Sequence, residues 1–307
     1  MSRHSAVRRL VSRVRYLILT VIVATATVRV SAGPATDVTA AELTAPTLAA
    51  WRAYEQLVDE RFQRASATST PYFALDQFTL YGWRETAVKN GLPTLRAKSA
   101  IHGGAPPNVP DGRIHHWVGA VFVPGATSDG VVRYLQTHAG RESESYEDVL
   151  ASRLLMRDGD RLAVFMKLRR SSIVTVTYNA EHAVEYTRYG AARAASRSVS
   201  TRIAELADAG TPNERERPLG NDQGFLWRLN AYWRYEQHGG GVLIECESIS
   251  LSRGVPALFR PFVMGTVERI ARESLERTLV SLRTALLRPL PASPKAIPPR
   301  PTPARPW

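Results

Sequence analysis

An apolar stripe at helical spacing is the first structured pattern along the chain, between residues 42 and 66. Charged residues separate its apolar members, and a proline stands near the start, where the first turn of a helix tolerates it. The pattern predicts one amphipathic helix, with an apolar face made of Leu48, Trp51, Val58 and Phe62.

Turn-forming residues dominate the next part of the chain. Residues 71–100 mix short apolar stretches with glycine and proline, and they predict a helix followed by a loop. Residues 103–112 hold three glycines and three prolines, which predict a boundary between an N-terminal helical region and the rest of the chain.

Alternating segments separated by turn signals then predict a run of antiparallel strands. The first covers residues 114–123 and is followed by a short helix over residues 129–137. Later connections are short except for a polar loop over residues 208–222. The expected later strands cover residues 149–157, 161–169, 172–179, 183–189, 196–206, 225–237 and 242–252.

Two hairpins can be aligned by their turns, because a wrong register would exchange the two faces of a strand. A loop over residues 158–160 and a turn over residues 238–241 give each hairpin one mainly apolar face. The expected pairs are Met156 with Leu162, Leu154 with Val164 and Ser152 with Met166 in the first hairpin, and Trp233 with Cys246, Ala231 with Ser248 and Arg234 with Glu245 in the second.

The strand over residues 225–237 therefore has an apolar face and a polar face. The residues expected to point inward are Phe225, Trp227, Leu229, Ala231, Trp233 and Tyr235. The other face of the sheet is expected to lie in water, with a solvated cross-strand ladder formed by Arg228, Arg234, Glu245 and Glu247.

A long amphipathic helix after the last strand is the expected cover of the apolar face. Beyond Leu287, eight prolines among residues 288–307 predict an extended tail. The apolar arc of the helix comprises Val267, Ala271, Leu275, Thr278, Leu279, Leu282 and Leu286.

This order of elements resembles the START-like superfamily, which is also known as the SRPBCC, Bet v 1-like or helix-grip fold. The segments that carry the resemblance are HHWVGAVFVPG (115–125), SRLL (152–155), GFLWRLNAYWRYE (224–236) and RESL (272–275). They are also similar to exported bacterial members of that superfamily without an assigned activity.

The resemblance covers residues 113–287 and implies an α+β helix-grip fold. In this fold a curved antiparallel β-sheet is wrapped around a long C-terminal helix, and here an N-terminal helical region precedes it. The resemblance implies no catalytic residues, because one scaffold of this kind hosts lipid carriers, hormone receptors and cyclases.

The formal net charge of +12 does not indicate nucleic-acid binding once it is divided along the chain. Residues 1–33 hold six arginines and residues 288–307 hold four basic residues, and neither segment contains an acid. Residues 34–287 therefore carry a formal charge of only +2. We expect no concentrated basic face and no nucleic-acid partner.

The N-terminal segment has the pattern of a signal peptide: a basic stretch to Arg15, an apolar run over residues 16–28, and small residues before Gly33. We expect cleavage after Ala32 and an exported protein, periplasmic or secreted, with no stable transmembrane anchor. The alternative is an uncleaved N-terminal membrane anchor. As a helix, however, the apolar run rises only about 20 Å, short of the roughly 30 Å hydrocarbon core.

These expectations divide the chain into four parts. They are a signal peptide (1–32), an N-terminal helical region and linker (33–112), a START-like helix-grip domain (113–287) and a proline-rich disordered tail (288–307).

The sequence shows no motif for a metal ion or another cofactor, and we expect none. His115 and His116 are adjacent in a strand, so their side chains point to opposite faces and cannot share one metal ion without a bulge. Cys246 is the single cysteine. It lies in an apolar strand pattern and is expected to be a small buried residue.

The leading hypothesis is that the protein binds or carries a hydrophobic small molecule or lipid in a cavity between the sheet and the C-terminal helix. The opposing interpretation, with equal weight, is that the aromatic side chains simply fill the core. The expected cavity-lining residues are Phe225, Trp227, Leu229, Trp233, Tyr235, His116, Ser152, Leu154, Val164, Ala271, Ser274 and Thr278.

Two other functional classes remain open. One is a cyclase- or hydrolase-like enzyme that uses the same cavity, with His116, Tyr235 or Ser152 as acid–base candidates. The other is a cell-envelope interaction protein that binds through its proline-rich tail. Polar groups that converge in the cavity would favour the enzyme, whereas an apolar lining would favour the carrier.

Overall fold

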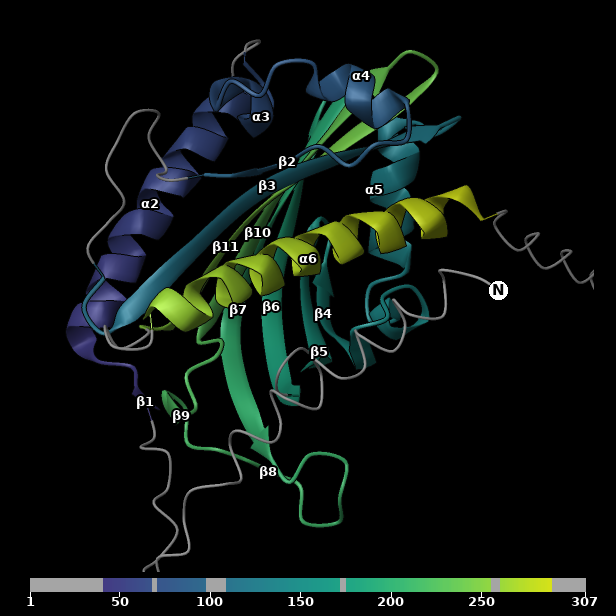
Figure 1. Ribbon diagram of the computed structural model, residues 1–307. Coiled ribbons are helices and arrows are strands. Elements are labelled where there is room, and N and C mark those ends of the chain that lie inside the picture. The colour runs from purple at the N-terminus through teal and green to yellow at the C-terminus, as the bar shows by residue number, and fades with distance from the viewer. Residues whose placement is uncertain (1–40, 68–70, 98–108, 172–174, 255–259, 289–307) are drawn as a thin grey trace, which may run out of the picture. The chain divides into compact units, whose positions relative to one another are not determined.

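The computed structural model describes residues 41–67, 71–97, 109–171, 175–254 and 260–288. The predicted signal peptide and the proline-rich tail after residue 288 lie outside the described residues. The described residues belong to one compact unit, in which a large antiparallel sheet lies between helices (Figure 1).

The main sheet has nine strands, with β2 at one edge and β4 at the other. The order is β2-β3-β11-β10-β7-β6-β5-β4, and β8 pairs with the end of β7. A separate two-stranded ladder joins β1 (Ala41–Glu42) to β9 (Asn221–Asp222). The strands are β2 (Thr94–Arg96), β3 (Gly112–Pro124), β4 (Val149–Asp158), β5 (Arg161–Ser171), β6 (Thr175–Tyr189), β7 (Arg193–Ala207), β8 (Arg215–Glu216), β10 (Arg228–His238) and β11 (Gly241–Arg253).

The register of the second hairpin is confirmed at each expected pair. Trp233 lies opposite Cys246, Ala231 opposite Ser248 and Arg234 opposite Glu245. In the first hairpin, the pairs Leu154–Val164 and Ser152–Met166 are also confirmed. The expected pairing of Met156 with Leu162 is wrong, because a bulge between Leu154 and Met156 shifts Met156 opposite Ala163.

Two strands expected at 172–179 and 183–189 are one long strand, β6. The segment between them, Ala180–Glu181–His182, continues the ladder to β5 and β7 with a single bulge at Glu181–His182. The sequence holds no glycine or proline there, so the expected break had no turn residue to support it.

One face of the sheet, here called the inner face, is covered by the C-terminal helix α6 (Arg260–Leu287) and by α5 (Ser128–Thr137). Helix α6 crosses in front of the sheet and packs against β3, β11 and β2 (Figure 1). Leu275, Leu279 and Leu282 are buried there in one cluster with Val121 and Ile244.

Gly119 lets α6 approach β3 closely. A Cβ atom at this position would stand 2.9 Å from a Leu279 methyl carbon and 2.8 Å from Thr94, closer than side chains pack. Leu279 of α6 therefore packs against β3 at a position where the strand has no side chain.

The opposite face, here called the outer face, is covered by the N-terminal helices α2 (Ala45–Ala67), α3 (Ala74–Gln77) and α4 (Trp83–Val88). Trp51, Val58 and Phe62 of α2 share a buried cluster with Tyr232 and Ile249 of the sheet. A second cluster joins Phe73, Leu75 and Trp83 of the α3–α4 segment to Val118 and Phe122 of β3.

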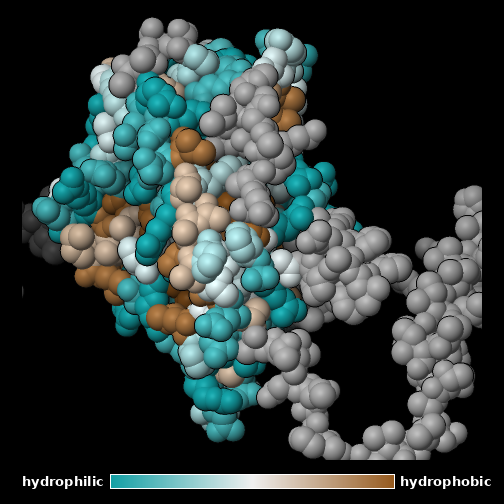
Figure 2. Space-filling view, turned by 90° about the vertical axis from the view of Figure 1, so that its left-hand side faces the viewer, coloured by the Kyte–Doolittle hydropathy of each residue, from teal (hydrophilic) through white to brown (hydrophobic). Residues whose placement is uncertain are grey.

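This cover corrects the expectation that one face of the sheet lies in water. Arg234, Glu245 and Glu247 of the expected solvated ladder are fully buried, and Arg228 is half-buried. Over these strands the water-exposed surface belongs to α2 instead, where hydrophilic areas surround smaller apolar patches (Figure 2), whereas residues such as Ala183 on the outer face of β6 are exposed. The helix-grip α+β architecture is confirmed, with an additional helical layer on the outer face.

Candidate functional site

The inner face carries a row of side chains that crosses five strands in register. Trp117 of β3 lies opposite Ser248 of β11, and Ser248 lies opposite Ala231 of β10. Ala231 in turn lies opposite Ser198 of β7, which lies opposite Val184 of β6. Short side chains thus occupy the middle of the row, between a tryptophan at one end and a valine at the other.

A neighbouring row runs parallel to the first on the same face. Leu229 of β10 donates its backbone N–H to the Ser200 hydroxyl of β7 at 3.0 Å, and Ser200 lies opposite His182 of β6. His182 lies opposite Val164 of β5, which lies opposite Leu154 of β4. In this row a single histidine therefore lies between a serine of β7 and apolar side chains of β5 and β4.

Some apolar side chains of the inner face remain partly open to solvent, although others, such as Val121, Tyr235 and Ile244, are buried. Those that stay half-buried are Trp117, Leu154, Met166, Val184, Leu229, Ala231 and Trp233. On the outer face, by contrast, Val118, Ala120, Tyr232, Leu243 and Ile249 are all fully buried under the N-terminal helices. On the strands that the N-terminal helices cover, the apolar surface left for a further molecule thus lies on the inner face.

Helix α6 presents small side chains beside its buried leucines. Ala271, Ser274 and Thr278 are half-buried, and the Thr278 hydroxyl donates to the Ser274 carbonyl oxygen at 2.9 Å. Because that hydroxyl is satisfied within the helix, it does not require a partner from the sheet. Beside these leucines, α6 therefore adds only short side chains at Ala271, Ser274 and Thr278.

An ion cluster joins α6 to the edge of the sheet formed by β4 and β5. Arg277 Nε lies 3.2 Å from Asp148 Oδ2, in the segment just before β4, and Arg170 of β5 pairs with the same carboxylate. The helix packs on β3 near one end of the strand order, whereas β4 forms the other end. This cluster consequently joins α6, which packs on β3, to the segment before β4 and to β5 at the other end of the strand order.

His182 is the buried titratable group of the second row. Its side chain is 4% exposed, and its Nδ1 lies 3.3 Å from the Ser198 hydroxyl. Its Nε2 has no hydrogen-bond partner within the described residues. Burial lowers the pKa of His182 to about 4, so the imidazole is neutral at pH 7.

The structure brings many of the predicted cavity-lining residues together on the inner side. Trp233 and Tyr235 follow each other on one face of β10, and the Tyr235 hydroxyl lies 3.0 Å from that of Ser196. Ser152 is half-buried on β4, and its hydroxyl accepts the backbone N–H of Ser143. The remaining residues placed on this side are Leu154, Val164, Leu229, Ala271, Ser274 and Thr278.

Three predicted residues lie elsewhere. Trp227 precedes β10, packs in the cluster under α2 and donates its indole N–H to Asp222 at 3.0 Å. Phe225 is 39% exposed, with the Arg253 guanidinium 5.6 Å from its ring centroid. His116 lies on the outer face. The expected strand began three residues too early, and this error put Phe225 and Trp227 into its alternation.

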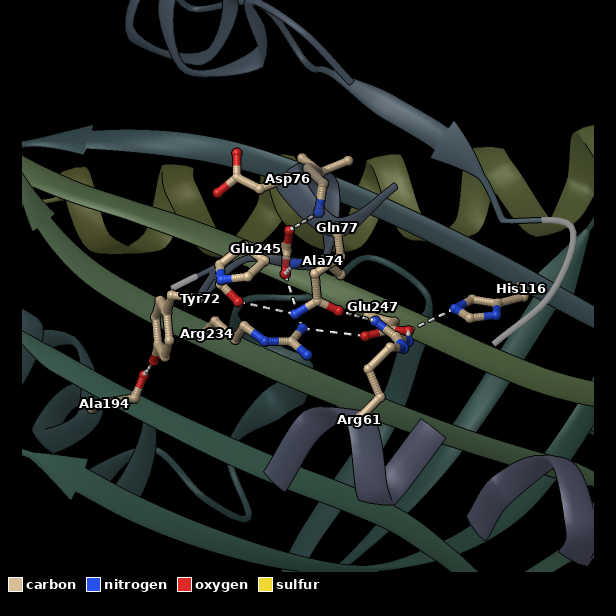
Figure 3. A network of polar contacts seen from close by, with 12 residues as sticks. Arg61, Tyr72, Ala74, Asp76, Gln77, His116, Ala194, Arg234, Glu245 and Glu247 are labelled. Carbon is tan, nitrogen blue, oxygen red and sulfur yellow. Dashed lines mark hydrogen bonds and ion pairs between the residues drawn. The ribbon is translucent and has the colours of Figure 1, made fainter. Parts of the chain in front are cut away.

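His116 belongs to a buried polar network between the sheet and the N-terminal helices (Figure 3). Arg234 lies at its centre and donates from Nη1 to Glu245 at 2.9 Å and to Glu247 at 3.2 Å. Glu245 also accepts the backbone N–H groups of Ala74 and Leu75, at 2.9 and 2.8 Å. Two charged strand residues therefore fix the first turn of α3 on the sheet.

The other end of the network fixes α2. His116 Nε2 lies 2.7 Å from Glu247, and His116 Nδ1 lies 2.7 Å from the Tyr54 hydroxyl. Because a carboxylate only accepts, Nε2 carries the proton and Nδ1 accepts from Tyr54. Arg61 pairs with Glu247 and donates to Gln77 at 2.9 Å.

This network has balanced charge and is almost closed to solvent: His116, Arg234, Glu245 and Glu247 are buried, and the Arg61 side chain is 13% exposed. Burial lowers the pKa of His116. Burial also opposes ionisation of Glu247, but Arg61 and His116 hold the pKa of its carboxyl below the usual range. Two arginines then face two carboxylates around a neutral histidine, an arrangement that holds helices to a sheet.

The acid–base candidates therefore do not converge. His116 is sealed on the outer face, whereas Tyr235 and Ser152 lie on different strands of the inner side with separate partners. Within the described residues, no group of three or more His, Cys, Asp or Glu side chains is placed to hold a metal ion. In the same part of the chain, no helix is long and apolar enough to cross a membrane.

Sequence reasoning passed over the two serine motifs that shape the inner face. Ser196, Ser198 and Ser200 on β7 and Ser248, Ser250 and Ser252 on β11 both follow the pattern Ser-x-Ser-x-Ser. In a strand this spacing puts all three hydroxyls on one face. The repeated serines were therefore visible in the sequence. Their place on the inner face became clear only when β7 and β11 were known to pair with β10 on either side.

Comparison with known proteins finds likeness in structure alone. No protein-family model matches the chain, and no curated protein matches it. Among solved structures it is similar to a STAR-related lipid transfer protein from Xanthomonas axonopodis, with 16% identity over 64% of this chain and 99% of that chain, at a TM-score of 0.41.

Two other neighbours are of the same kind. Human StAR-related lipid transfer protein 5 is 12% identical over 78% of this chain and 97% of its own, at a TM-score of 0.41. An aromatase/cyclase from Streptomyces sp. R1128 is 10% identical over 57% of this chain and 94% of its own, at a TM-score of 0.36. The chain has a START-like, helix-grip fold. Its strand order and the position of α6 carry that statement, and these likenesses say nothing of what the chain binds.

Proposed function

We propose that the chain binds an apolar small molecule or lipid on the inner face, between the sheet and α6. The observation that carries the proposal is the contrast between the two faces. Over β3, β11, β10 and β7 the outer face is covered by α2, α3 and α4, whereas large apolar side chains such as Trp117 and Trp233 stay half-buried on the inner face of the same strands. A ligand would remove this apolar surface from water, which favours binding.

The arrangement supports a binding or carrier protein over an enzyme. The acid–base candidates are separated, and the one buried histidine of the two inner rows, His182, is neutral and has an apolar partner on β5. Binding of an apolar molecule needs apolar area, which the two rows offer, whereas acid–base chemistry needs groups within hydrogen-bond reach of one reacting atom.

The leader supports export as part of the same proposal. A basic stretch, an apolar run and small residues end at Ala32. N-terminal sequencing of protein recovered from outside the cytoplasm should give Gly33 as the first residue. A start at Met1 in washed membranes would replace this view by a membrane-anchored binding protein.

The binding proposal can be tested with one charge placed on either face of β6. Val184 is half-buried on the inner face, and its neighbour Ala183 is exposed on the other face. Val184→Lys puts an ammonium group among apolar side chains, whereas Ala183→Lys puts it in water. The probe is N-phenyl-1-naphthylamine, a neutral apolar molecule whose fluorescence rises when it leaves water.

The natural protein and Ala183→Lys should bind the probe saturably and alike. Val184→Lys should bind it about tenfold more weakly, because the ligand would have to strip water from a charge. Thermal melts of both variants establish that each is folded, and Ala231→Leu supplies an uncharged variant that fills the same face. Equal probe binding by all four proteins, or none by the natural one, would refute the proposal.

A further inference from the structure

The two serine motifs lay a polar strip across an otherwise apolar face. Ser198 of β7 and Ser248 of β11 both pair with Ala231, which has no side chain beyond Cβ. Ser248, Ala231 and Ser198 are half-buried, so their short side chains leave this strip open to solvent. The strip runs from Trp117 toward β6.

His182 stands at the β6 end of this strip and is incompletely satisfied. Ser198 fixes its Nδ1 at 3.3 Å, while its Nε2 is buried without a hydrogen-bond partner within the described residues. Val164 and Ser200 are its partners across the ladder. Neither of them supplies a group to Nε2.

An unsatisfied ring nitrogen in a buried place costs free energy, which a hydrogen bond from a bound molecule would recover. The imidazole is neutral, so Nε2 either donates or accepts, depending on which nitrogen carries the proton. A hydroxyl group matches both cases because it donates and accepts. A carboxylate or an ammonium group would have to shed its water next to Val164 and Leu229, which is costly.

We propose that His182, held by Ser198, is the specificity-determining residue of the inner face and selects a neutral apolar ligand that carries a hydroxyl group. This inference rests on the proposed function, because it assigns a chemical class to the ligand of the same face. It predicts that a purely hydrocarbon molecule of the same shape binds less well than its apolar area alone would imply.

The test uses two probes that share one ring system, 1-pyrenemethanol and 1-methylpyrene. Each is titrated into the natural protein, into His182→Phe and into His115→Phe. His115 is the matched control, since it is a buried histidine of β3 whose Nε2 already pairs with Ser252 at 3.0 Å. The readout is the preference for the alcohol, given by the Kd for 1-methylpyrene divided by the Kd for 1-pyrenemethanol.

The preference should fall about threefold to tenfold in His182→Phe, the range of one neutral hydrogen bond. It should stay unchanged in His115→Phe, and 1-methylpyrene should bind His182→Phe at least as well as it binds the natural protein. A merely structural histidine would instead weaken both probes together. An unchanged preference in His182→Phe would overturn the inference and leave the proposed function standing.

Two further outcomes keep the test decisive. If the natural protein takes up neither probe, the proposed function itself fails. If His182→Phe does not fold, Ser198→Ala replaces it: this variant frees the ring at Nδ1, and the preference for the alcohol should fall in the same direction. A preference kept in full by Ser198→Ala would then contradict the role of His182.

Discussion

Arg234 and Glu245 face each other in register on β10 and β11, and both side chains are fully buried with 2.9 Å between Nη1 and Oε1. The pair can be predicted from the hairpin, but its burial cannot. It lies under the N-terminal helices, where the Phe62 ring of α2 stands 4.8 Å from the guanidinium carbon. The pair therefore makes the N-terminal helices part of the same folded unit as the sheet.

Removing the arginine should be strongly destabilising. Arg234→Met leaves Glu245 and Glu247 buried with one fewer cation, and we expect the free energy of unfolding to fall by about 3–5 kcal/mol in urea denaturation. Arg228→Met is the control, because Arg228 lies on the same face of β10 but is half-buried. It should cost about 1 kcal/mol or less. Equal costs for the two variants would show that the network does not hold the helices.

Two tryptophans on opposite faces should respond differently to truncation. Trp51 is 2% exposed in the outer cluster, so Trp51→Ala should cost about 3–5 kcal/mol in unfolding free energy. Trp233 is half-buried on the inner face, so Trp233→Ala removes less buried apolar surface than Trp51→Ala does. Its cost should lie below about 3 kcal/mol. An equal loss for both would indicate a filled core on the inner side.

Stability should fall as the pH drops below about 6.5. Burial lowers the pKa of both His115 and His182 to about 4, so between these values the unfolded chain binds protons that the folded chain does not. The loss is about 2 kcal/mol per histidine at pH 5. Glu205 acts in the opposite direction, because burial raises its pKa to about 7 and its contribution is lost as the pH rises.

The contribution of His182 to this pH dependence can be measured by urea denaturation of the natural protein and of His182→Phe at pH 7 and pH 5. The natural protein should lose more stability than the variant over this interval, because the variant has one titrating group fewer. Parallel losses in both proteins would contradict the burial of a neutral His182.

Loosening the ion cluster that joins α6 to Asp148 should speed ligand release from the inner face. Arg277→Met removes the link from α6 to Asp148, and stopped-flow release of N-phenyl-1-naphthylamine should become about 1.5-fold to fivefold faster. Arg269→Met is the control on the same helix, since Arg269 pairs with Glu273 one turn along. If both variants release the probe at the natural rate, the cluster does not close the site.

Local patterns predicted the register of β10 with β11 and the apolar faces of α2 and α6, because these depend on alternation and turn chemistry within short segments. The cover of the outer face could not be predicted in this way. Arg234, Glu245 and Glu247 alternate like a solvated ladder, and only the distant Arg61, Tyr54 and the first turn of α3 make them a buried network.

The site was predictable in part for the same reason. Trp233, Leu154 and Val164 follow from strand alternation, whereas His116 was assigned to the inner face although its neighbour His115 occupies that face. The alternation of Ser196, Ser198 and Ser200 marks the inner face as well, but its meaning depends on the strands beside it. His182 became a candidate only when its ladder partners and its free Nε2 were known.

The central claim, that the inner face is a site for an apolar ligand, is tested most directly by anomalous diffraction from crystals of the natural protein soaked with 1-bromonaphthalene. The bromine atom marks the position of the probe without any assumption about affinity. We expect one well-occupied bromine peak between the inner face and α6, beside Trp117, Ala231 and Trp233, and no such peak in crystals of Val184→Lys. Bromine found only on the molecular surface or under α2, with none on the inner face at saturating probe, would contradict the claim.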